Sequence, residues 1–332
     1  MDVRGMFSVD AKLVACLAAA WLIELLLGAP RFLPRPRRAA AFMLRAAEGG
    51  FWALARGFTK RDRQADRRAA DERRAGIFFT LYGLLFAFIA VAAPLELARR
   101  AHPVFYYLLS AAGFYFALDT RAAADGAWKR DAGAAGARTE REICRAVAAL
   151  AKNALDGVAA PLFFIFLGMP LGLALPFAAA RGTAELLDEH VGRRDSKYDF
   201  FGWGAARLDD VLNFVPARLC GLLLPLCALF CMGAGAAARS RSVARRDRLN
   251  HLSPNSAWPE AAFAGALGIR IESGISDRTH EREGGFSAAS NAAVGDDLHA
   301  PETKDILLAV RLMIVFSAAM ALLTCAALLW LS

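Results

Sequence analysis

The chain lacks the motifs that mark several common classes of enzyme. Its 332 residues contain no GxxxxGK[ST] phosphate loop, no GxGxxG, no HExxH and no CxxC. Only six cysteines are present, and five of them lie in apolar runs, where cysteine packs as a small hydrophobic side chain. None of the five histidines stands at metal-ligand spacing from another. Collagen, disorder and small disulfide scaffolds are therefore excluded.

Apolar sequence is abundant, since 57% of the residues are hydrophobic. These residues cluster in six long runs separated by charged stretches, at about 11–28, 77–93, 104–118, 157–180, 211–237 and 306–331. Such runs predict an all-α, polytopic integral membrane protein with about five or six membrane-embedded helical segments. We expect one membrane-embedded domain over 1–332.

Two of the runs raise alternatives. The run at 11–28 contains Glu24, and a cleaved signal peptide is its rival interpretation. Because the run is long for a signal core and no A-x-A site follows, a retained helix is favoured. The run at 157–180 contains three prolines, so we expect a broken or re-entrant element there. Residues 77–93 and 104–118 predict a membrane hairpin whose link runs from Pro94 to Pro103.

The polar segments differ in kind. Residues 29–76 carry thirteen Lys or Arg against five acids, which predicts a basic cytoplasmic segment. Within it, the mixed charges of 60–74 predict a solvated helix, whereas a nucleic-acid site would need interleaved aromatics, so no nucleic-acid partner is expected. Residues 119–156 are expected to be helical, and 272–304 predict a long polar loop.

Ionisable groups crowd the ends of apolar runs in three segments, where charges usually have a function. In the first, KNALDGVAAPLF (152–163), helical spacing places Lys152 and Asn153 on the same face as Asp156. A helix cap with a surface ion pair explains this spacing equally well. The second segment, YDFFGWGAARLDDVLNFVPARL (198–219), carries the densest group of polar side chains: Arg207, Asp209, Asp210, Asn213 and Arg218.

Residue type suggests roles within this second segment. Asp209 and Asp210, with the Asn213 amide one turn on, could hold Mg²⁺, which takes oxygen ligands and often bridges to phosphates. Arg207 and Arg218 could clamp phosphate or carboxylate oxygens. The alternative is a charged collar at the membrane surface.

The third segment is HLSPNSAWPEAAFAGALGIRI (251–271). Ser253 and Asn255 flank a proline and predict a turn, and Asn255 or Ser256 could cap a helix begun near Pro259. A capped amphipathic helix lying on the membrane explains most of this pattern, although it does not require Glu260 so near an apolar stretch.

These three segments, together with IELLLGAPRFLPRP (23–36), resemble the CobD/CbiB family of cobalamin biosynthesis. Their order and rough spacing match, and the DDVLN-x-x-PAR and SPN-x-x-W-P-E-A-A blocks are the most specific. The resemblance implies an adenosylcobinamide-phosphate synthase in the bacterial inner membrane. Such an enzyme uses ATP and Mg²⁺ to join a corrinoid, adenosylcobyric acid, to aminopropanol or its phosphate.

The resemblance and the residue types together give a candidate site. We expect catalytic roles for Asp209, Asp210, Arg207, Lys152 and Asp156, with Asp209 and Asp210 as metal ligands. We expect substrate contacts from Asn153, Asn213, Arg218, Ser253, Asn255 and Glu260.

The chain also departs from the family pattern. The family block V-E-S-x-A-E-N-x-x-D-G appears here as VAALAKNALDG, so Ala148 and Lys152 replace two glutamates. A later block survives at 185–193 only as Asp188 and Gly192. The main alternative is therefore a catalytically degraded family member with a binding or regulatory role, and the broken run suggests transport as a third. If every run crosses once, 198–219 and 251–271 fall on opposite sides of the membrane.

Overall fold

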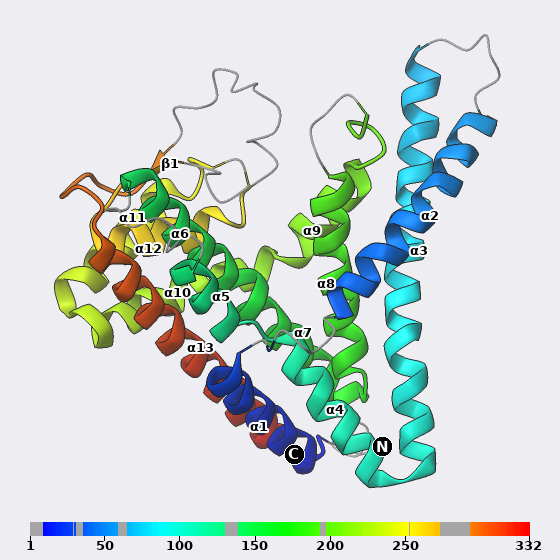
Figure 1. The fold of residues 1–332 in the computed structure, drawn as a ribbon, viewed down its shortest axis with the longest axis horizontal. Helices are drawn as coiled ribbons and strands as arrows, with labels where there is room; N and C mark the ends of the chain where they lie inside the picture. Colours follow the sequence, from blue (N-terminus) through cyan, green and yellow to red (C-terminus); the bar gives the residue numbers. More distant parts are fainter. Residues whose placement is uncertain are drawn as a thin grey trace.

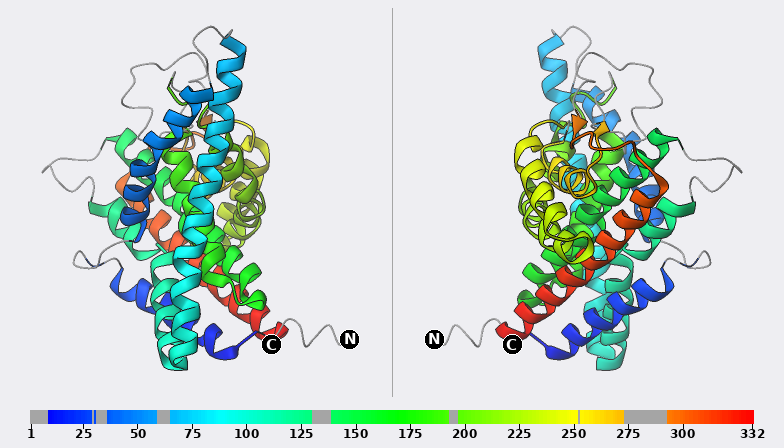
Figure 2. Two further views of the ribbon diagram at one scale, coloured as in Figure 1. Left: turned by 90° about the vertical axis from the view of Figure 1, so that its right-hand side faces the viewer. Right: turned by 90° about the vertical axis from the view of Figure 1, so that its left-hand side faces the viewer.

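The computed structural model describes residues 9–28, 30, 36–58, 65–129, 139–192, 197–251, 253–272 and 293–332. Over these residues the chain is helical apart from one antiparallel pair of two-residue strands, β1 (Ile271–Glu272) and β2 (Ala293–Val294). The α-helices are α1 (Ala11–Leu27), α2 (Pro36–Phe58), α3 (Ala65–Ala101), α4 (Pro103–Ala117), α5 (Arg121–Lys129), α6 (Glu140–Asn153), α7 (Ala160–Gly168), α8 (Ala174–Val191), α9 (Trp203–Leu212), α10 (Phe214–Met232), α11 (Ala234–Asp247), α12 (Ala257–Leu267) and α13 (Thr303–Leu331). The predicted all-α fold is confirmed (Figures 1 and 2).

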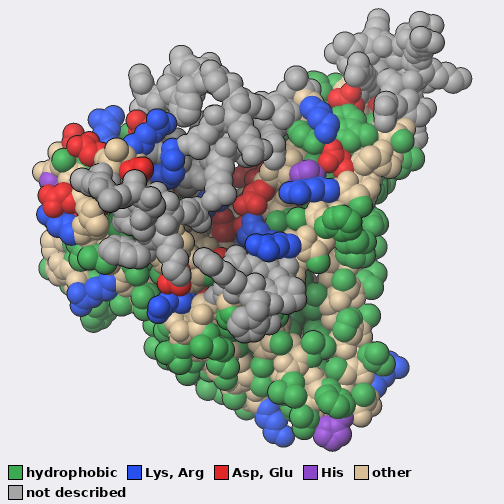
Figure 3. Space-filling model, in the orientation of Figure 1, with side chains coloured by type: hydrophobic (Ala, Val, Ile, Leu, Met, Phe, Trp, Pro, Cys, Tyr) green, Lys and Arg blue, Asp and Glu red, His purple; other side chains and the backbone are tan. Residues whose placement is uncertain are grey.

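Four helical stretches of the described chain are long and apolar enough to cross a membrane: Ala69–Ala101, Glu140–Leu171, Phe214–Met232 and Thr303–Leu331. Apolar side chains cover the lower and right-hand parts of the face in Figure 3, and charged side chains gather over its upper half. The chain is thus a polytopic membrane protein, as predicted. Of the predicted polar helix at 60–74, residues 65–74 form the start of α3, and 60–64 lie outside the described residues.

Helices α3 and α4 form the predicted hairpin, but the predicted link is wrong. Helix α3 continues through Pro94 to Ala101, so the turn occurs at His102. A proline inside a membrane helix is tolerated when neighbouring groups satisfy the freed carbonyl. The His102 ring caps α4 by accepting a hydrogen bond from the Val104 amide at 3.2 Å, and Pro103 occupies the first position of α4.

The run at 157–180 is broken, as predicted. Helix α6 begins with a capping box between Thr139 and Glu142 and passes into a π-helical segment, Ala154–Ala159, before α7. A 3-10 turn follows at Met169–Leu171, and the chain then reverses so that α8 packs against α7. Because π-helical turns often occur at functional sites, the position of Asp156 within this one is notable.

The run at 211–237 is divided rather than continuous. Asn213 separates α9 from α10, and Gly233, with φ 89°, reverses the chain into α11. Helix α12 then packs against both α10 and α11, and a Cβ at Gly265 would lie 2.8 Å from the Arg239 carbonyl oxygen. Helix α12 begins at Ala257 and is almost entirely buried. The predicted amphipathic helix on the membrane surface is therefore wrong.

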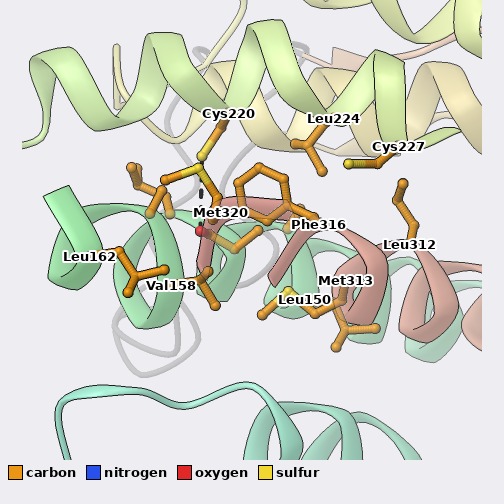
Figure 4. Close-up of a cluster of buried hydrophobic side chains, with 14 of the residues drawn as sticks. Leu150, Val158, Leu162, Cys220, Leu224, Cys227, Leu312, Met313, Phe316 and Met320 are labelled. Carbon is orange, nitrogen blue, oxygen red and sulfur yellow. Dashed lines mark hydrogen bonds between the residues drawn. The ribbon is translucent and has the colours of Figure 1, made fainter. Parts of the chain in front are cut away.

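The main core lies where α6, α7, α10 and α13 meet. Figure 4 shows Leu150 and Val158 facing Cys220, Leu224 and Phe316 across this junction. The predicted loop at 272–304 contributes β2, which pairs with β1 through Ile271 and Val294. Residues 273–292 of that loop lie outside the described residues.

A second, smaller core joins α2, α3, α8 and the segment before α9. At its edge the Glu48 carboxylate accepts hydrogen bonds from His190 at 2.8 Å, Lys197 at 3.0 Å and Tyr198 at 2.8 Å. Although burial opposes ionisation, these hydrogen bonds lower the pKa of Glu48 to about 2. The ring of Trp52 stacks on the ring of Phe201, with the two centroids 4.5 Å apart. This stack completes the contact between α2 and the start of the 198–219 segment.

Candidate functional site

A buried arginine, Arg181 on α8, is the centre of a polar cluster. Its Nη1 atom donates to Oε2 of Glu185 at 3.0 Å and to the backbone oxygen of Asp156 at 2.7 Å. Its Nη2 atom donates to Oδ1 of Asp156 at 2.6 Å and to Oδ1 of Asn213 at 2.8 Å. Because Nε also faces Asn213, every polar atom of the guanidinium has a partner. Arg181 therefore ties α8 to the π-helical segment and to the α9–α10 junction.

The cluster continues into α9 through Asn213. The Asn213 side-chain amide donates to both carboxylate oxygens of Asp209, at 3.0 and 2.9 Å, which confirms the predicted contact one turn apart. Burial raises the pKa of Asp209 to about 8; Arg181 opposes this rise, and the carboxylates of Asp156, Asp188 and Glu185 add to it. Asp209 is therefore mainly protonated at neutral pH.

The cluster is linked to helix α2. Arg37, in the first turn of α2, pairs with Glu185 at 2.9 Å and with Glu189 at 2.8 Å. Glu185 thus lies between a buried arginine and an exposed one. The basic segment predicted at 29–76 is in direct contact with the candidate site through this pair.

Asn255 brings the second and third segments together. Its Nδ2 atom donates to the backbone oxygen of Asp210 at 2.8 Å, and its Oδ1 atom accepts from Arg218 at 2.8 Å. The reversal from α10 into α11 returns the chain to the same end of α10, which removes the expected separation of the two segments. One site can therefore draw residues from both 198–219 and 251–271.

The turn that carries Asn255 is fixed from within. The Ser253 hydroxyl accepts hydrogen bonds from the backbone amides of Asn255 and Ser256, at 3.4 and 3.3 Å. Glu260 is fully buried and lies 3.1 Å from Nε2 of His251, whose Nδ1 accepts from the Ser253 amide at 2.9 Å. The predicted cap at Ser256 is in place by position, but its side chain makes no capping hydrogen bond. Ser253 and Glu260 thus position Asn255.

The first segment contributes its residues differently. Asp156 joins the Arg181 cluster, and Lys152 lies close enough for its charge to act on Asp156. Asn153 turns away and donates to the backbone oxygen of Asp119, whose amide in turn donates to Gly157 at 3.1 Å. These bonds hold the π-helical segment against the start of α5.

Arg207 and Asp210 lie outside the buried cluster. Their nearest charged atoms are 3.8 Å apart across an i, i+3 pair on the exposed side of α9, and the Arg207 side chain is 67% exposed. Asp209 and Asp210 therefore contact different partners. Figure 3 shows acidic side chains deep in a hollow over α9, with basic side chains beside them.

The carboxylates around Arg181 suit a divalent cation by charge. Asp156, Glu185, Asp188 and Asp209 act electrostatically on one another around one arginine, so the cluster has an excess of acids. Within the described ranges, however, no three His, Cys, Asp or Glu side chains are close enough to hold a metal by themselves. Mg²⁺ at Asp209 would need further oxygen ligands from substrate phosphates and water, as is usual for this ion.

Sequence reasoning missed the two residues that organise the site, Arg181 and Glu185. Arg181 directly follows the apolar run at 157–180, and Glu185 stands one helical turn further on. A cation and an anion spaced i, i+4 at the end of a membrane segment was the available signal. The contacts with Asp156 and Asn213 lie 25 and 32 residues away along the chain, where spacing carries no information.

Comparison with known proteins gives a consistent result. The family model described as CobD/Cbib protein matches residues 129–313. The cobalamin biosynthesis protein CobD of Citrobacter koseri is 33% identical over 318 residues, covering 90% of this chain and 92% of that protein. CobD of Klebsiella pneumoniae is 44% identical over 177 residues, which cover 53% of this chain and 51% of that protein. CbiB of Salmonella typhimurium is 42% identical over 187 residues, which cover 56% of this chain and 54% of that protein. In these two matches the chain spans about half the length of the relative. No solved structure matches the chain.

The fold and the cluster define a class: a polytopic helical membrane protein with a buried group of acids around one arginine, built where three sequence segments meet. Within that class, the chain belongs to the CobD/CbiB family of cobalamin biosynthesis proteins. The relatives named above are bacterial proteins.

Proposed function

We propose that this protein is an adenosylcobinamide-phosphate synthase of the bacterial inner membrane. It joins adenosylcobyric acid to aminopropanol or its phosphate, with ATP as the activating substrate. The observation that carries the proposal is the meeting of the three family segments: Arg181 joins Asp156 of the first to Asn213 of the second, and Asn255 of the third donates to the Asp210 backbone of the second.

The reaction has two steps, and in each step one bond forms and one breaks. A carboxylate oxygen of the corrinoid attacks the terminal phosphorus of ATP, ADP leaves, and an acyl phosphate forms. The amine nitrogen then attacks the acyl carbon, phosphate leaves, and the nitrogen gives a proton to a base. Bound Mg²⁺ would neutralise phosphate oxygens in this chemistry.

The residues of the chain have distinct tasks in this scheme. Asp209, once ionised, would hold the cation, and Arg181 and Asn213 fix the direction of its carboxylate through the bonds described above. Arg207, exposed at the rim, would offset the charge that develops on the phosphates. Asp156, on which the charge of Lys152 acts, could accept the proton released by the amine.

Complementation tests the proposal directly. We expect the chain to restore cobinamide-phosphate synthesis to a bacterial strain that lacks its own synthase, and membranes from that strain to form the amide only with ATP and Mg²⁺. An Asp209→Asn variant present in the membrane at the same level provides the inactive control. Failure of the wild-type chain, correctly inserted, to make any product would contradict the proposal.

One observation favours the degraded-enzyme alternative. Ala148 is fully buried in the main core, so the chain has a methyl group where the family pattern implies a glutamate, and no carboxylate is present there. With Lys152 replacing the second glutamate, a protein that binds a corrinoid without converting it remains the second candidate. Corrinoid binding by purified protein without product formation would support it.

A further inference from the structure

A row of four exposed apolar side chains and one partly buried arginine runs along α10. The members are spaced four residues apart and each step turns about 40° around the axis, so the row crosses the exposed side of the helix obliquely: Phe214, Arg218, Leu222, Leu226 and Phe230. Leu222, Leu226 and Phe230 are 64%, 55% and 78% exposed. Because α10 is long and apolar enough to cross a membrane, we place the exposed row against lipid. Arg218 is therefore a cation in the lipid-facing row, one turn from the polar end of the helix.

The guanidinium of Arg218 is held in one position from one side. Its Nη1 atom donates to the Phe214 carbonyl oxygen at 2.9 Å and to Oδ1 of Asn255 at 2.8 Å. Its central carbon lies 3.6 Å from the centroid of the Phe214 ring and 5.7 Å from that of Trp258. These contacts fix the plane of the group and involve Nη1 and the guanidinium face, not Nε or Nη2.

The Nε and Nη2 edge of Arg218 has no partner within the described part of the chain. Neither Nε nor Nη2 reaches an acceptor there, and no described carboxylate is within ion-pair distance of Arg218. An arginine at the membrane without a counter-ion is unfavourable, so an anion from outside the protein is required. A guanidinium edge matches two oxygens of one phosphate group.

We propose that Arg218 binds the phosphate of a bilayer phospholipid, with an acyl chain along Leu222, Leu226 and Phe230. The helix rises about 18 Å between Arg218 and Phe230, at 1.5 Å per residue, which is close to the ~15 Å depth of one leaflet of the hydrocarbon core. The head and the tail of the lipid can therefore both contact the exposed side of one helix. This assigns Arg218 an anion other than the substrate phosphate suggested by its sequence motif, and it does not depend on the proposed reaction.

Lipid retention tests the proposal on the whole purified protein. Native mass spectrometry compares bound phosphatidylglycerol with diacylglycerol of the same acyl chains, which lacks the phosphate. We expect wild-type protein to retain phosphatidylglycerol, and Arg218→Gln to retain about tenfold less, the loss expected for one charge-assisted pair. Arg100→Gln is the matched control, because Arg100 is exposed but already paired with Glu96 at 2.7 Å. Its retention should equal that of the wild type.

A second variant covers the case in which Arg218→Gln is not recovered as folded protein. Leu226→Gln changes an exposed side chain of the row and should also lower phosphatidylglycerol retention. Equal retention by Arg218→Gln and wild type, or equal retention of the two lipids, would overturn the proposal. Displacement of the lipid by soluble aminopropanol phosphate would also overturn it, because the anion at Arg218 would then be the substrate. Each readout is bound lipid, so it stays interpretable if the proposed reaction is wrong.

Discussion

Arg181 and Asp156 form an ion pair of 2.6 Å between the middle of α8 and a π-helical turn, 25 residues apart in sequence. The pair joins the two ends of the broken run at 157–180. Since Arg181 also binds Asn213 and Glu185, a single side chain joins α8 to the first and second segments. Its removal should therefore affect stability as well as activity.

We expect Arg181→Met to lower the free energy of unfolding by about 3–5 kcal/mol, because it removes the cation paired with Asp156 and one of the two cations paired with Glu185. Thermal unfolding of the purified protein in detergent measures this loss. Arg207→Met is the control: its side chain is 67% exposed and its pair with Asp210 is 3.8 Å long. Such a pair contributes about 0–1 kcal/mol. Equal losses for the two variants would refute the central role of Arg181.

The second core gives a prediction on pH. The pKa of Glu48 is lowered to about 2, so its ionised form stabilises the fold above the ordinary glutamate pKa. That contribution should be lost as pH falls from about 4.5 towards 2. Glu48→Gln should unfold at lower temperature at pH 6 and show a flatter dependence on pH in this window. A variant as pH-sensitive as the wild type would show that another group is responsible.

Helix α3 supplies a test of topology. Arg74 and Arg100 are both exposed and lie near opposite ends of this 37-residue helix. With the basic 29–76 segment in the cytoplasm, a cysteine at Arg100 should react with an impermeant reagent added to intact cells. A cysteine at Arg74 should react only after the cells are opened. The native cysteines are first replaced by serine or alanine, and the reverse labelling pattern would invert the topology.

The sequence predicted local features of the fold well, and it predicted the joints between them less well. Apolar runs identify membrane helices because burial in lipid acts on each segment separately, and the Asp209–Asn213 contact follows from helical spacing. Helix α3 passes through Pro94, where the run suggested an end, because membrane helices tolerate proline.

The site itself was predicted only in part. Residues of the three segments contact one another as the candidate site requires, but Arg181 and Glu185 were not expected. Their significance depends on the turn between α7 and α8, which decides what lies beside α8 and which no spacing rule encodes. Likewise, Arg218 and Asp209 belong to one sequence motif, but Arg218 binds Asn255 and Asp209 binds Asn213, because Asn213 interrupts the helix between them.

The proton on Asp209 makes Mg²⁺ binding depend on pH. With the pKa of this carboxyl raised to about 8, a cation must displace a proton, so affinity should rise up to about tenfold per unit between pH 6 and 8. Calorimetry in two buffers of different ionisation enthalpy should show proton release. Asp209→Asn should abolish the dependence on pH, whereas Asp210→Asn should weaken binding and keep it. Wild-type affinity independent of pH would exclude Asp209 as a ligand.

The last prediction concerns Lys152, which replaces a glutamate of the family pattern. Its charge acts on Asp156 inside a cluster that already has an excess of acids. If the site is active, Lys152→Glu should lower synthase activity at least about tenfold, the change expected when a favourable contact of about 1.4 kcal/mol is lost. Lys152→Gln removes the charge without reversing it, so its synthase activity should lie between that of the wild type and that of Lys152→Glu.

The opposite result has an equally clear meaning. A large gain of activity in Lys152→Glu over an inactive parent would show that this chain had lost catalysis through the substitution. Ala148→Glu should not be added at first, because Ala148 is fully buried and an acid there would be forced into the apolar core. When Lys152 is changed alone, the effect of its charge is measured without a folding defect caused by an acid at position 148. Activity in isolated membranes then distinguishes a rearranged site from a degraded one.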